Sequence, residues 1–467
     1  MEPSLQGDAH SRAQSNHYLT DSLASLFLKT ALPIVFIMLV NGAFTVVDGI
    51  FVGTLVSADA LSAVTSVFPL FMVVVAISTM VASGMASIMA RRLGAGDKAG
   101  AEQILAQAYL LSVVVCAVLI ATYLLFGGGA ITLLSDDNPH ILTMAEAYIR
   151  IVFLTSPLTF FLSMQGDSLR SEGHVEAMSL MMLAAIVLNG VFNYVLIAHL
   201  HLGVAGSAYG TALAQTASIA AVLWYRASGR AKLPALPNGF AQIGKDWKAM
   251  LMLGVPSSFG NLGVSFQAAT FLLSINFIVA DSALSVTAYG IVSRLFAFFF
   301  LPLLGLALAS QSIIGNNYGA KEFARSNTAL KIALNVAFVY CIGAQILFVV
   351  FAAELAGMFV KDQAVIDEAA HIIPIMTAAL SLTGISFILS SYFQALGDAV
   401  KATVVSLSKF FVFGPIMLLV LPHYLGLDGV WWSMAGGEIL TALTCLVVLW
   451  LNAKRTGARL GMFLPAS

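Results

Sequence analysis

The sequence predicts an all-α polytopic membrane protein, with twelve transmembrane helices in two six-helix lobes related by a parallel internal repeat. Of its 467 residues, 59% are hydrophobic and only 10% are charged, whereas soluble domains contain about 25% charged residues. Apolar runs long enough to cross a bilayer, roughly 20 residues each, recur along the whole chain. Landmarks of the first half also return in the second half at a nearly constant spacing.

Each apolar run is interpreted as one transmembrane helix. The runs cover approximately residues 26–53, 60–90, 102–126, 142–165, 177–198, 204–225, 249–279, 285–314, 328–352, 370–395, 402–422 and 428–451. Lysine and arginine gather in the loops on one side, and Lys361 is the only one in the loops on the other side. The positive-inside rule therefore places both termini in the cytoplasm. The polar N-terminal segment lacks the apolar core of a signal peptide, so we expect a disordered cytoplasmic tail.

The longest of the basic loops lies near the middle of the chain and contains Pro234 and Pro237, as is typical of a linker. The expected organisation is a tail over 1–22, a first lobe over 23–226, a linker over 227–248, a second lobe over 249–453 and a tail over 454–467.

Five pairs of landmarks support the repeat, at offsets of 223 to 225 residues. They are Leu32-Pro33 with Val255-Pro256, Gly94-Ala95 with Gly319-Ala320, Gly173 with Gly397, Leu202-Gly203 with Leu425-Gly426, and Gln215 with Glu438. Six spans per lobe is an even number, so both lobes run in the same direction, related by an axis along the membrane normal. Two such bundles facing each other would leave a central cleft.

The first span carries one acidic residue, Asp48. A charge at the bilayer centre costs about 2.5–3.5 kcal/mol even on lenient insertion scales, so we expect Asp48 to face the bundle interior. Asn41, Thr45 and Asp48 are spaced i, i+4 and i+7 and form one polar stripe on a helix. We interpret Asp48 as part of a cation or proton site. For Asn41 and Thr45, simple hydrogen bonding to a neighbouring helix is the favoured alternative.

The fifth and sixth spans supply further polar groups. Asn189 and Asn193 are four residues apart and share one helix face, and Thr211 lies on the next span. If these spans pack against the first, all three residues share a pocket with Asp48, and Na⁺ could bind at Asp48, Asn189 and Thr211 because hard cations prefer oxygen ligands. A single carboxylate in a low dielectric favours a proton carrier instead. Interhelical hydrogen bonding remains the alternative for the two asparagines.

The spans also contain a proline that could bend a helix and charged residues that could form an ion pair. Pro33 lies 15 residues before Asp48, and proline removes a backbone hydrogen bond, so it marks a hinge or a static kink. In the second half, Arg294, Lys409 and Glu438 lie in apolar surroundings. We expect Glu438 to pair with Arg294 or Lys409, and a structural pair is favoured over a second coupling site.

Several classes of function are disfavoured. The chain has no P-loop, no HExxH and no GxSxG motif, and its three cysteines lack ligand spacing. We therefore expect no enzymatic activity, no ATP-driven transport and no cofactor beyond a coupling H⁺ or Na⁺. The net charge of −1 gives no indication of nucleic-acid binding. A receptor or scaffold would need signalling or adaptor domains, for which the tails are too short.

Short motifs across about 26–451 resemble one transporter family. They are Leu32-Pro33, Val47-Asp48-Gly49-Ile50-Phe51-Val52-Gly53, Ala90-Arg91-Arg92-Leu93-Gly94-Ala95-Gly96-Asp97, Arg170-Ser171-Glu172-Gly173, Ala288-Tyr289-Gly290-Ile291, Ile314-Gly315-Asn316-Asn317-Tyr318-Gly319-Ala320-Lys321 and Phe393-Gln394-Ala395-Leu396-Gly397. The chain is similar to the multidrug and toxic compound extrusion (MATE) family, and most similar to its bacterial DinF-like branch. The resemblance implies a V-shaped pair of lobes and cation-coupled export of small lipophilic or cationic drugs. We expect a monomer in the bacterial inner membrane.

In the DinF-like branch, the first-lobe site uses an acid on span one, an asparagine and an acid on span five, and a threonine on span six. The resemblance assigns the first acid to Asp48, the asparagine to Asn189 and the threonine to Thr211. The second acid falls on Asn193, which departs from the pattern, weakens the case for tight sodium binding and leaves the coupling to Asp48. The proline that bends span one in the branch matches Pro33.

The expected mechanism is alternating access, driven by H⁺ or alternatively by Na⁺. The alternative function is a flippase for lipid-linked precursors or oligosaccharides from the same superfamily. That activity would need a basic cleft to hold a pyrophosphate, and basic residues within the spans are few.

Overall fold

The structure is a computed structural model, and it describes residues 16–134, 138–238, 243–278, 282–457 and 459–463. Within these ranges the fold is helical, apart from one isolated antiparallel bridge between Arg459 and Phe463. The first half contains α2 (His17–Thr20), α3 (Leu23–Leu55), α4 (Ala58–Ser66), α5 (Phe68–Gly94), α6 (Lys98–Leu134), α7 (Pro139–Leu154), α8 (Ser156–Glu172), α9 (Val175–Tyr194), the π-helix η1 (Val195–His199) and α10 (Gly203–Ala227). The second half contains α11 (Trp247–Ile278), α12 (Ala283–Gly319), α13 (Phe323–Val350), α14 (Ala352–Gly357), α15 (Gln363–Thr377), α16 (Leu380–Leu396), α17 (Ala399–Leu407), the π-helix η2 (Ser408–Phe413), α18 (Gly414–Leu425) and α19 (Leu427–Thr456).

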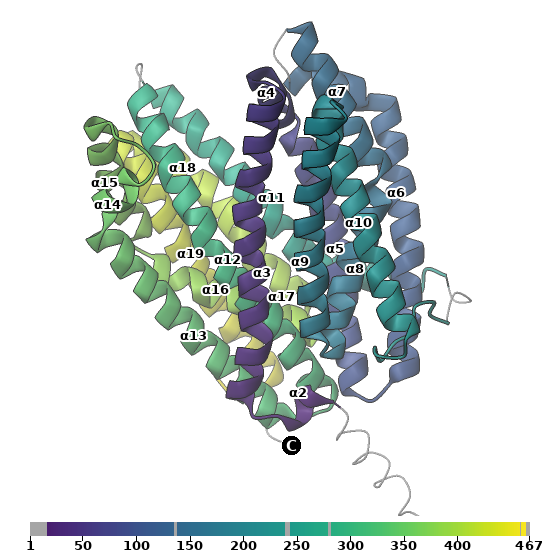
Figure 1. Cartoon of the computed structure of the whole chain (residues 1–467). Coiled ribbons are helices and arrows are strands. Elements are labelled where there is room, and N and C mark those ends of the chain that lie inside the picture. Colours follow the sequence, from purple (N-terminus) through teal and green to yellow (C-terminus); the bar gives the residue numbers. More distant parts are fainter. Residues whose placement is uncertain (1–15, 135–137, 239–242, 279–281, 458, 464–467) are drawn as a thin grey trace, which may run out of the picture. The chain divides into compact units, whose positions relative to one another are not determined.

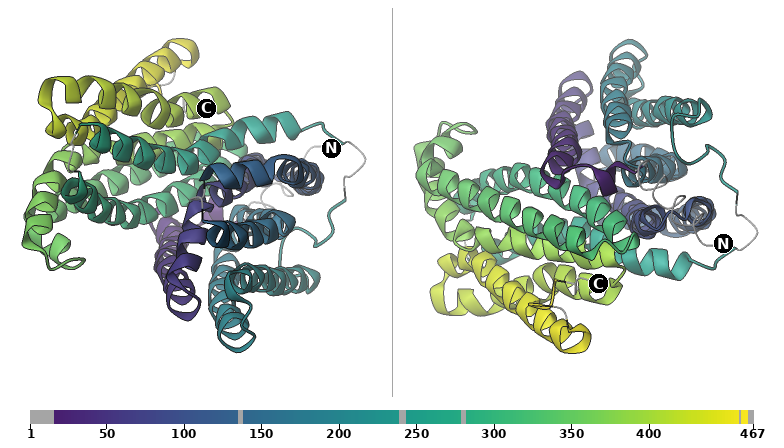
Figure 2. Two further views of the ribbon diagram at one scale, coloured as in Figure 1. Left: turned by 90° about the horizontal axis from the view of Figure 1, so that it is seen from above. Right: turned by 90° about the horizontal axis from the view of Figure 1, so that it is seen from below.

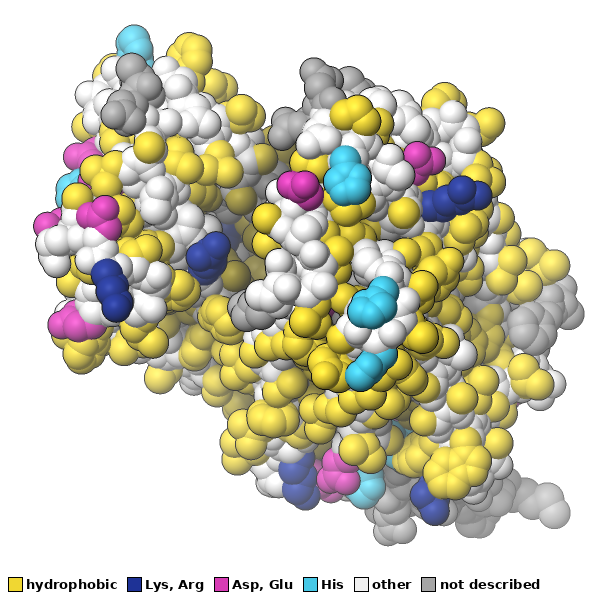
Figure 3. Space-filling view, turned by 45° about the horizontal axis from the view of Figure 1, so that its top comes forward, with side chains coloured by type: hydrophobic (Ala, Val, Ile, Leu, Met, Phe, Trp, Pro, Cys, Tyr) yellow, Lys and Arg dark blue, Asp and Glu magenta, His cyan; other side chains and the backbone are white. Residues whose placement is uncertain are grey.

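The prediction of a polytopic membrane protein is confirmed. Nine helices of the described residues are long and apolar enough to cross a membrane, and two bent helix pairs raise the number to as many as eleven. α10 is long enough, with 25 residues, but its glycine, serine and threonine residues lower its mean hydropathy. Figure 3 shows the same character on one face of the molecule, where hydrophobic side chains predominate.

The predicted fourth and tenth spans are each divided into two helices. α7 and α8 meet at an angle of 49°, and α15 and α16 meet at 50°. Pro157 lies in the first turn of α8, where its missing N–H costs nothing but prevents a hydrogen bond back to α7. Pro374 lies near the end of α15 and removes one of the last hydrogen bonds of that helix. Hydropathy alone does not detect such breaks, because both halves are apolar.

The described chain divides into two compact units. The first unit contains Leu32–Ser258 with the described residues of Met1–Asp21, and the second contains Ser22–Ala31 with the described residues of Phe259–Ser467. Figure 1 labels the helices of both units, and the end views of Figure 2 show that the helices within each unit pack side by side.

The glycines of the sequence repeat adopt matching backbone conformations in the two units. Gly173 and Gly397 end α8 and α16 with φ of +91° and +88°. Gly203 and Gly426, at the starts of α10 and α19, have φ of +58° and +61°. Glycine is favoured at such left-handed positions because it has no Cβ to clash. The motifs at Gly173 and Gly397 therefore recur because the same helix end recurs, and Gly203 and Gly426 share a positive φ.

Asp97, in the loop between α5 and α6, stabilises the start of α6. Its carboxylate accepts hydrogen bonds from the backbone N–H of Gly100 at 2.8 Å and from Arg92 at 2.7 Å. These bonds, led by the one from Gly100, hold the pKa of Asp97 below its usual value. The Arg-Leu-Gly-Ala-Gly-Asp motif is thus explained locally as a helix end followed by a helix cap.

Candidate cation site

Asp48 contacts two helices of the same unit through hydrogen bonds. It lies on α3 and is partly buried. Asn193 of α9 donates from Nδ2 to Asp48 Oδ1 at 2.5 Å, and Ser207 of α10 donates from Oγ to the same oxygen at 3.5 Å. Asn193 is fully buried. Three apolar helices thus bring their polar residues to one point, as expected for a carboxylate shielded from lipid.

Two further residues close the set into a ring of hydrogen bonds, which we call the Asp48 ring: Asp48, Asn193, Asn189, Thr211 and Ser207. Asn193 Nδ2 also donates to Asn189 Oδ1 at 3.3 Å, and Asn189 Nδ2 donates to Thr211 Oγ1 at 2.8 Å. Thr211 Oγ1 then donates to the backbone carbonyl of Ser207 at 3.1 Å. The ring therefore connects span one to both of the spans on which sequence analysis placed the other ligands.

The direction of these bonds fits an ionised Asp48. A carboxylate accepts hydrogen bonds and donates none, and both Asn193 and Ser207 donate to Asp48. The other end of the Asn193 amide, Oδ1, is buried and has no hydrogen-bond partner among the described residues. Leaving a buried carbonyl oxygen without a hydrogen bond costs about 1–3 kcal/mol. Stability of the fold therefore does not explain why Asn193 Oδ1 is left without a partner.

Gly210 makes room for this amide. A Cβ built on Gly210 would lie 2.0 Å from Asn193 Oδ1 and 3.0 Å from the backbone nitrogen of Asn193. Every residue other than glycine would displace the Asn193 side chain or the backbone of α9. The close approach of α9 and α10 at Gly210 therefore positions the Asn193 amide beside Asp48.

The surroundings of Asp48 are apolar. Val52, one helical turn further along α3, packs in a buried cluster with Ala60 and Val204. Tyr148 of α7 packs against that cluster and lies within electrostatic range of Asp48. In such a low-dielectric environment, charge on Asp48 interacts strongly with any bound cation.

The structure brings together Asp48, Asn189, Asn193 and Thr211, the four residues predicted to form the site. Ser207 was missed, although it lies four residues before Thr211 and hence on the same face of α10. Asn41 and Thr45 do not join the ring. Both are exposed, and the hydroxyl of Thr45 donates to the backbone carbonyl of Asn41 at 3.0 Å.

The Asp48 ring offers one carboxylate as an anionic ligand for a metal ion. The described residues contain no group of three or more His, Cys, Asp or Glu side chains that could hold one. For Na⁺ at Asp48, Asn189 and Thr211, the oxygens of Asn189 and Thr211 already accept hydrogen bonds from Asn193 and Asn189. Na⁺ would therefore have to use the remaining lone pairs of these two oxygens or replace their hydrogen bonds, whereas a proton requires only one oxygen of Asp48.

Of the two partners expected for Glu438 in the second half, the structure shows Lys409. Lys409 of η2 and Glu438 of α19 form a buried ion pair. Arg294 does not belong to it, because its side chain is exposed on α12. Apolar neighbours in sequence suggested that Arg294 is buried, but they do not fix how α12 is rotated about its axis.

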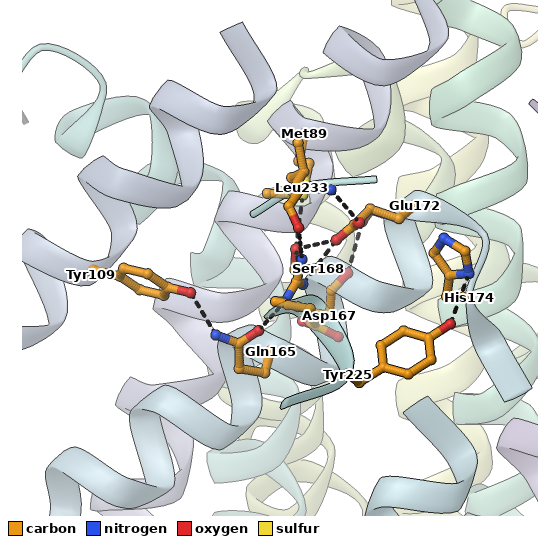
Figure 4. Close-up of polar contacts among 11 residues, drawn as sticks. Met89, Tyr109, Gln165, Asp167, Ser168, Glu172, His174, Tyr225 and Leu233 are labelled. Carbon is orange, nitrogen blue, oxygen red and sulfur yellow. Dashed lines mark hydrogen bonds and ion pairs between the residues drawn. The ribbon is translucent and has the colours of Figure 1, made fainter. Parts of the chain in front are cut away.

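A second buried ion pair, in the first unit, was missed. Arg226, at the end of α10, and Glu172, at the end of α8, are both fully buried and lie 2.9 Å apart. Arg226 also donates to Gln165 Oε1 at 2.7 Å and to Ser168 Oγ at 2.9 Å, and Gln165 donates to Tyr109 at 2.5 Å. Figure 4 shows Gln165, Ser168 and Glu172 of α8 in this cluster, with Tyr109 hydrogen-bonded to Gln165. Arg226 is the last residue of the predicted first lobe, beside the basic linker, and no periodicity connects it to an acid 54 residues earlier.

This second cluster holds the predicted linker. Leu233 donates its backbone N–H to Glu172 Oε2 at 3.0 Å and accepts from Arg226 through its carbonyl at 3.1 Å. Nearby, His174 is 3.4 Å from the hydroxyl of Tyr225, and burial lowers the pKa of His174 while Glu172 opposes this shift. The cluster therefore fixes the start of the connection between the two halves to the first unit.

The comparisons with known proteins agree with this architecture. The MatE family profile matches the chain twice, over residues 33–195 and 256–420. The multidrug export protein MepA of Staphylococcus aureus is 24% identical over 428 residues, covering 90% of this chain and 92% of MepA. A MATE structure in the bent conformation aligns with a TM-score of 0.84 and 25% identity, covering 92% of this chain and 95% of that one. A MATE structure in the straight conformation aligns with a TM-score of 0.82 and 24% identity, covering 91% and 95%. The two matched stretches cover well over half of the sequence, and the chain therefore belongs to the MatE family, the multidrug and toxic compound extrusion transporters.

Proposed function

We propose that this chain is a proton-coupled antiporter that exports drugs and toxic organic cations by alternating access. The observation that carries the proposal is the Asp48 ring, in which one carboxylate of a membrane span is bonded to groups on two neighbouring spans. Such a group responds to a cation by changing its bonds to both neighbours at once. The export of several drugs is suggested by the name of the relative MepA.

The Asn193 amide supports H⁺ as the coupling ion. With Asp48 ionised, Nδ2 of Asn193 donates to it, and Oδ1 has no partner in the described chain. After a proton binds, Asp48 becomes a donor, and a half-turn of the amide would present Oδ1 as its acceptor. One side chain can thus serve both protonation states. Na⁺ remains the alternative coupling ion, with Asp48, Asn189 and Thr211 as its ligands.

The proposed cycle begins with a proton arriving from outside at Asp48. The neutral acid exchanges its bonds with Asn193, and α3 bends near Pro33, so the substrate leaves outward. Pro33 lies inside α3 and cannot donate a backbone hydrogen bond, so bending there breaks fewer bonds than elsewhere. MATE structures have been solved in a bent and in a straight conformation. This supports the proposal that members of the family change between two shapes.

The finer assignments are part of the same proposal. We place the chain in the DinF-like branch, as a monomer in the bacterial inner membrane with both termini in the cytoplasm. We count twelve spans by adding α10 to the nine helices and two bent pairs. The twofold match of the family profile supports two lobes in a parallel repeat. We propose small lipophilic or cationic molecules as substrates.

The test is efflux of a lipophilic cation, such as ethidium, from cells expressing Asp48→Asn. We expect export to be lost at normal protein levels. The matched control is Asp59→Asn, which makes the same change at an exposed acid on α4. Undiminished efflux by the Asp48 variant would remove that residue from the mechanism, whereas loss in both variants would show an unspecific effect.

A further inference from the structure

We propose that Lys409 and Glu438 form a second proton-exchange site, in the second unit and separate from the Asp48 ring. This inference rests on the proposed proton-coupled antiport. The ligand is a proton, which adds to a carboxylate oxygen of Glu438 and ends its ion pair with Lys409. The net charge of the pair then changes from zero to plus one.

The position of the pair is the first observation. Glu438 lies 11 residues after the start of α19 and 18 before its end, and Lys409 lies well inside the span Ala399–Leu425. The exposed fractions of the two residues are only 5% for Lys409 and 2% for Glu438. Both ionisable groups are therefore buried near the middle of membrane spans, where such groups are rare and usually functional.

The pair lacks the supporting bonds that would make it a stabilising feature. Apart from their ion pair, Lys409 Nζ and both carboxylate oxygens of Glu438 have no hydrogen-bond partner among the described residues. A buried ion pair offsets the desolvation of its charges only when further hydrogen bonds satisfy the remaining donors and acceptors. By contrast, the Arg226–Glu172 pair is hydrogen-bonded to Gln165, Ser168 and the backbone of Leu233. A contribution to fold stability thus explains the Arg226–Glu172 pair, but it does not explain the Lys409–Glu438 pair.

The ammonium group of Lys409 has a second set of partners. Its Nζ lies 5.0 Å from the ring centroids of both Phe300 and Phe410. Cation–π attraction to these rings would hold the charged lysine after Glu438 is neutralised. Proton uptake therefore need not leave a buried cation without any partner, which is the usual obstacle to protonating one member of a buried pair.

The backbone at Lys409 is also unusual. Lys409 lies in the π-helix η2, between the α-helices α17 and α18. Single π-turns within α-helices occur frequently at functional sites. Since a π-turn holds one more residue than an α-turn, its conversion would rotate the lysine relative to Glu438. The structure thus provides a local element that can respond to loss of the ion pair.

In the first unit, the position that corresponds to Glu438 holds a neutral side chain. Gln215 corresponds to Glu438 at the repeat offset of 223, and its neutral amide donates to Thr159 at 3.1 Å. Besides Lys409, the thiols of Cys341 on α13 and Cys445 on α19 lie within electrostatic range of Glu438. The second unit therefore differs from the first by a charged pair where a neutral hydrogen bond would suffice.

The test measures how many protons drive each substrate molecule. In proteoliposomes, a set pH gradient would drive the accumulation of tetraphenylphosphonium against its own concentration gradient. The membrane potential would be clamped. Each coupled proton contributes a factor of about ten in accumulation per unit of pH difference. The test variant combines Glu438→Gln with Lys409→Met, which removes both charges and leaves no unpaired one. We expect about tenfold less accumulation per unit of pH difference than in the wild type. Unchanged accumulation by the folded variant would overturn the proposal.

A second measurement does not depend on transport. Infrared difference spectra of the purified protein, between alkaline and acid buffer, report the carbonyl stretch of newly protonated carboxylic acids. We expect one component to disappear in Glu438→Gln and another in Asp48→Asn. If the spectrum of Glu438→Gln is the same as that of the wild type, the proposal of a second site is overturned. This result does not depend on whether the variant is active in liposomes. Absence of accumulation in the wild type, with the Glu438 component present, would instead contradict only the proposed antiport.

Discussion

Asn193 donates the shorter of the two hydrogen bonds to Asp48, so Asn193→Asp is the most informative substitution. In the structure, Asn193 Nδ2 lies 2.5 Å from Asp48 Oδ1. An aspartate there would put a carboxylate oxygen in place of the donating nitrogen. The attractive hydrogen bond would become a repulsion between two anions, unless a cation binds between them.

The size of this effect follows from Coulomb's law. At 2.5 Å and an effective dielectric constant of about 20, two unit charges repel by about 7 kcal/mol. Relaxation to about 4 Å would leave about 4 kcal/mol, which corresponds to roughly three factors of ten in cation affinity. The doubly ionised pair would therefore bind H⁺ or Na⁺ far more tightly than Asp48 alone.

The assay is efflux from proteoliposomes with the pH and sodium gradients varied separately. We expect Asn193→Asp to become stimulated by a sodium gradient at constant pH, and its half-maximal pH to move upward. Asn41→Asp is the control, because it adds a carboxylate to α3 at an exposed position outside the Asp48 ring. The reasoning is refuted if Asn193→Asp shows neither a sodium response nor a changed pH profile while remaining folded.

The remaining predictions concern packing and stability. Gly210→Ala should abolish efflux while the protein still folds, because its Cβ would lie 2.0 Å from Asn193 Oδ1; normal efflux would show that the amide is not needed there. Glu172→Gln should lower the free energy of unfolding by about 3 kcal/mol, since it leaves the buried Arg226 guanidinium without its counter-charge; a thermal melt with an unchanged midpoint would contradict this. Burial lowers the pKa of His174, so the folded state binds this proton less readily than the unfolded state. Stability should therefore fall as the pH drops below the unfolded value of 6.5, and less so in His174→Gln; equal acid sensitivity of both proteins would exclude the histidine.

The residues of the Asp48 ring could be predicted from the sequence to a large extent. An acid in an apolar span must avoid lipid, and Asn189 and Asn193 share one helix face through their spacing. The spacing of Asn41, Thr45 and Asp48 did not correctly predict which residues of α3 belong to the ring. α3 is apolar on nearly all sides, so periodicity does not determine which face points inward, and Asn41 and Thr45 are exposed.

The ion pairs could not be predicted with the same success. Arg226 lies at a span end and reads as a loop charge that sets topology, yet its side chain is fully buried. Its partner Glu172 is far away in sequence, and the contact depends on how α8 and α10 pack. Similarly, three charged residues of the second half offered several pairings, and only the rotation of α12 separated Arg294 from the others.

The attachment of the central connection has a practical consequence for dissecting the protein. Beyond Leu233, the backbone N–H of Asn238 donates to Glu102 at 2.6 Å, that of Gly244 donates to Gln107 at 3.0 Å, and the indole of Trp247 donates to the carbonyl of Gln107 at 3.1 Å. Cutting the gene in the proline-containing stretch would strip these groups from the amino-terminal half. A co-expressed pair of fragments should instead be divided so that the amino-terminal piece keeps Trp247, because only then does it carry its own cover for the ends of α6, α8 and α10.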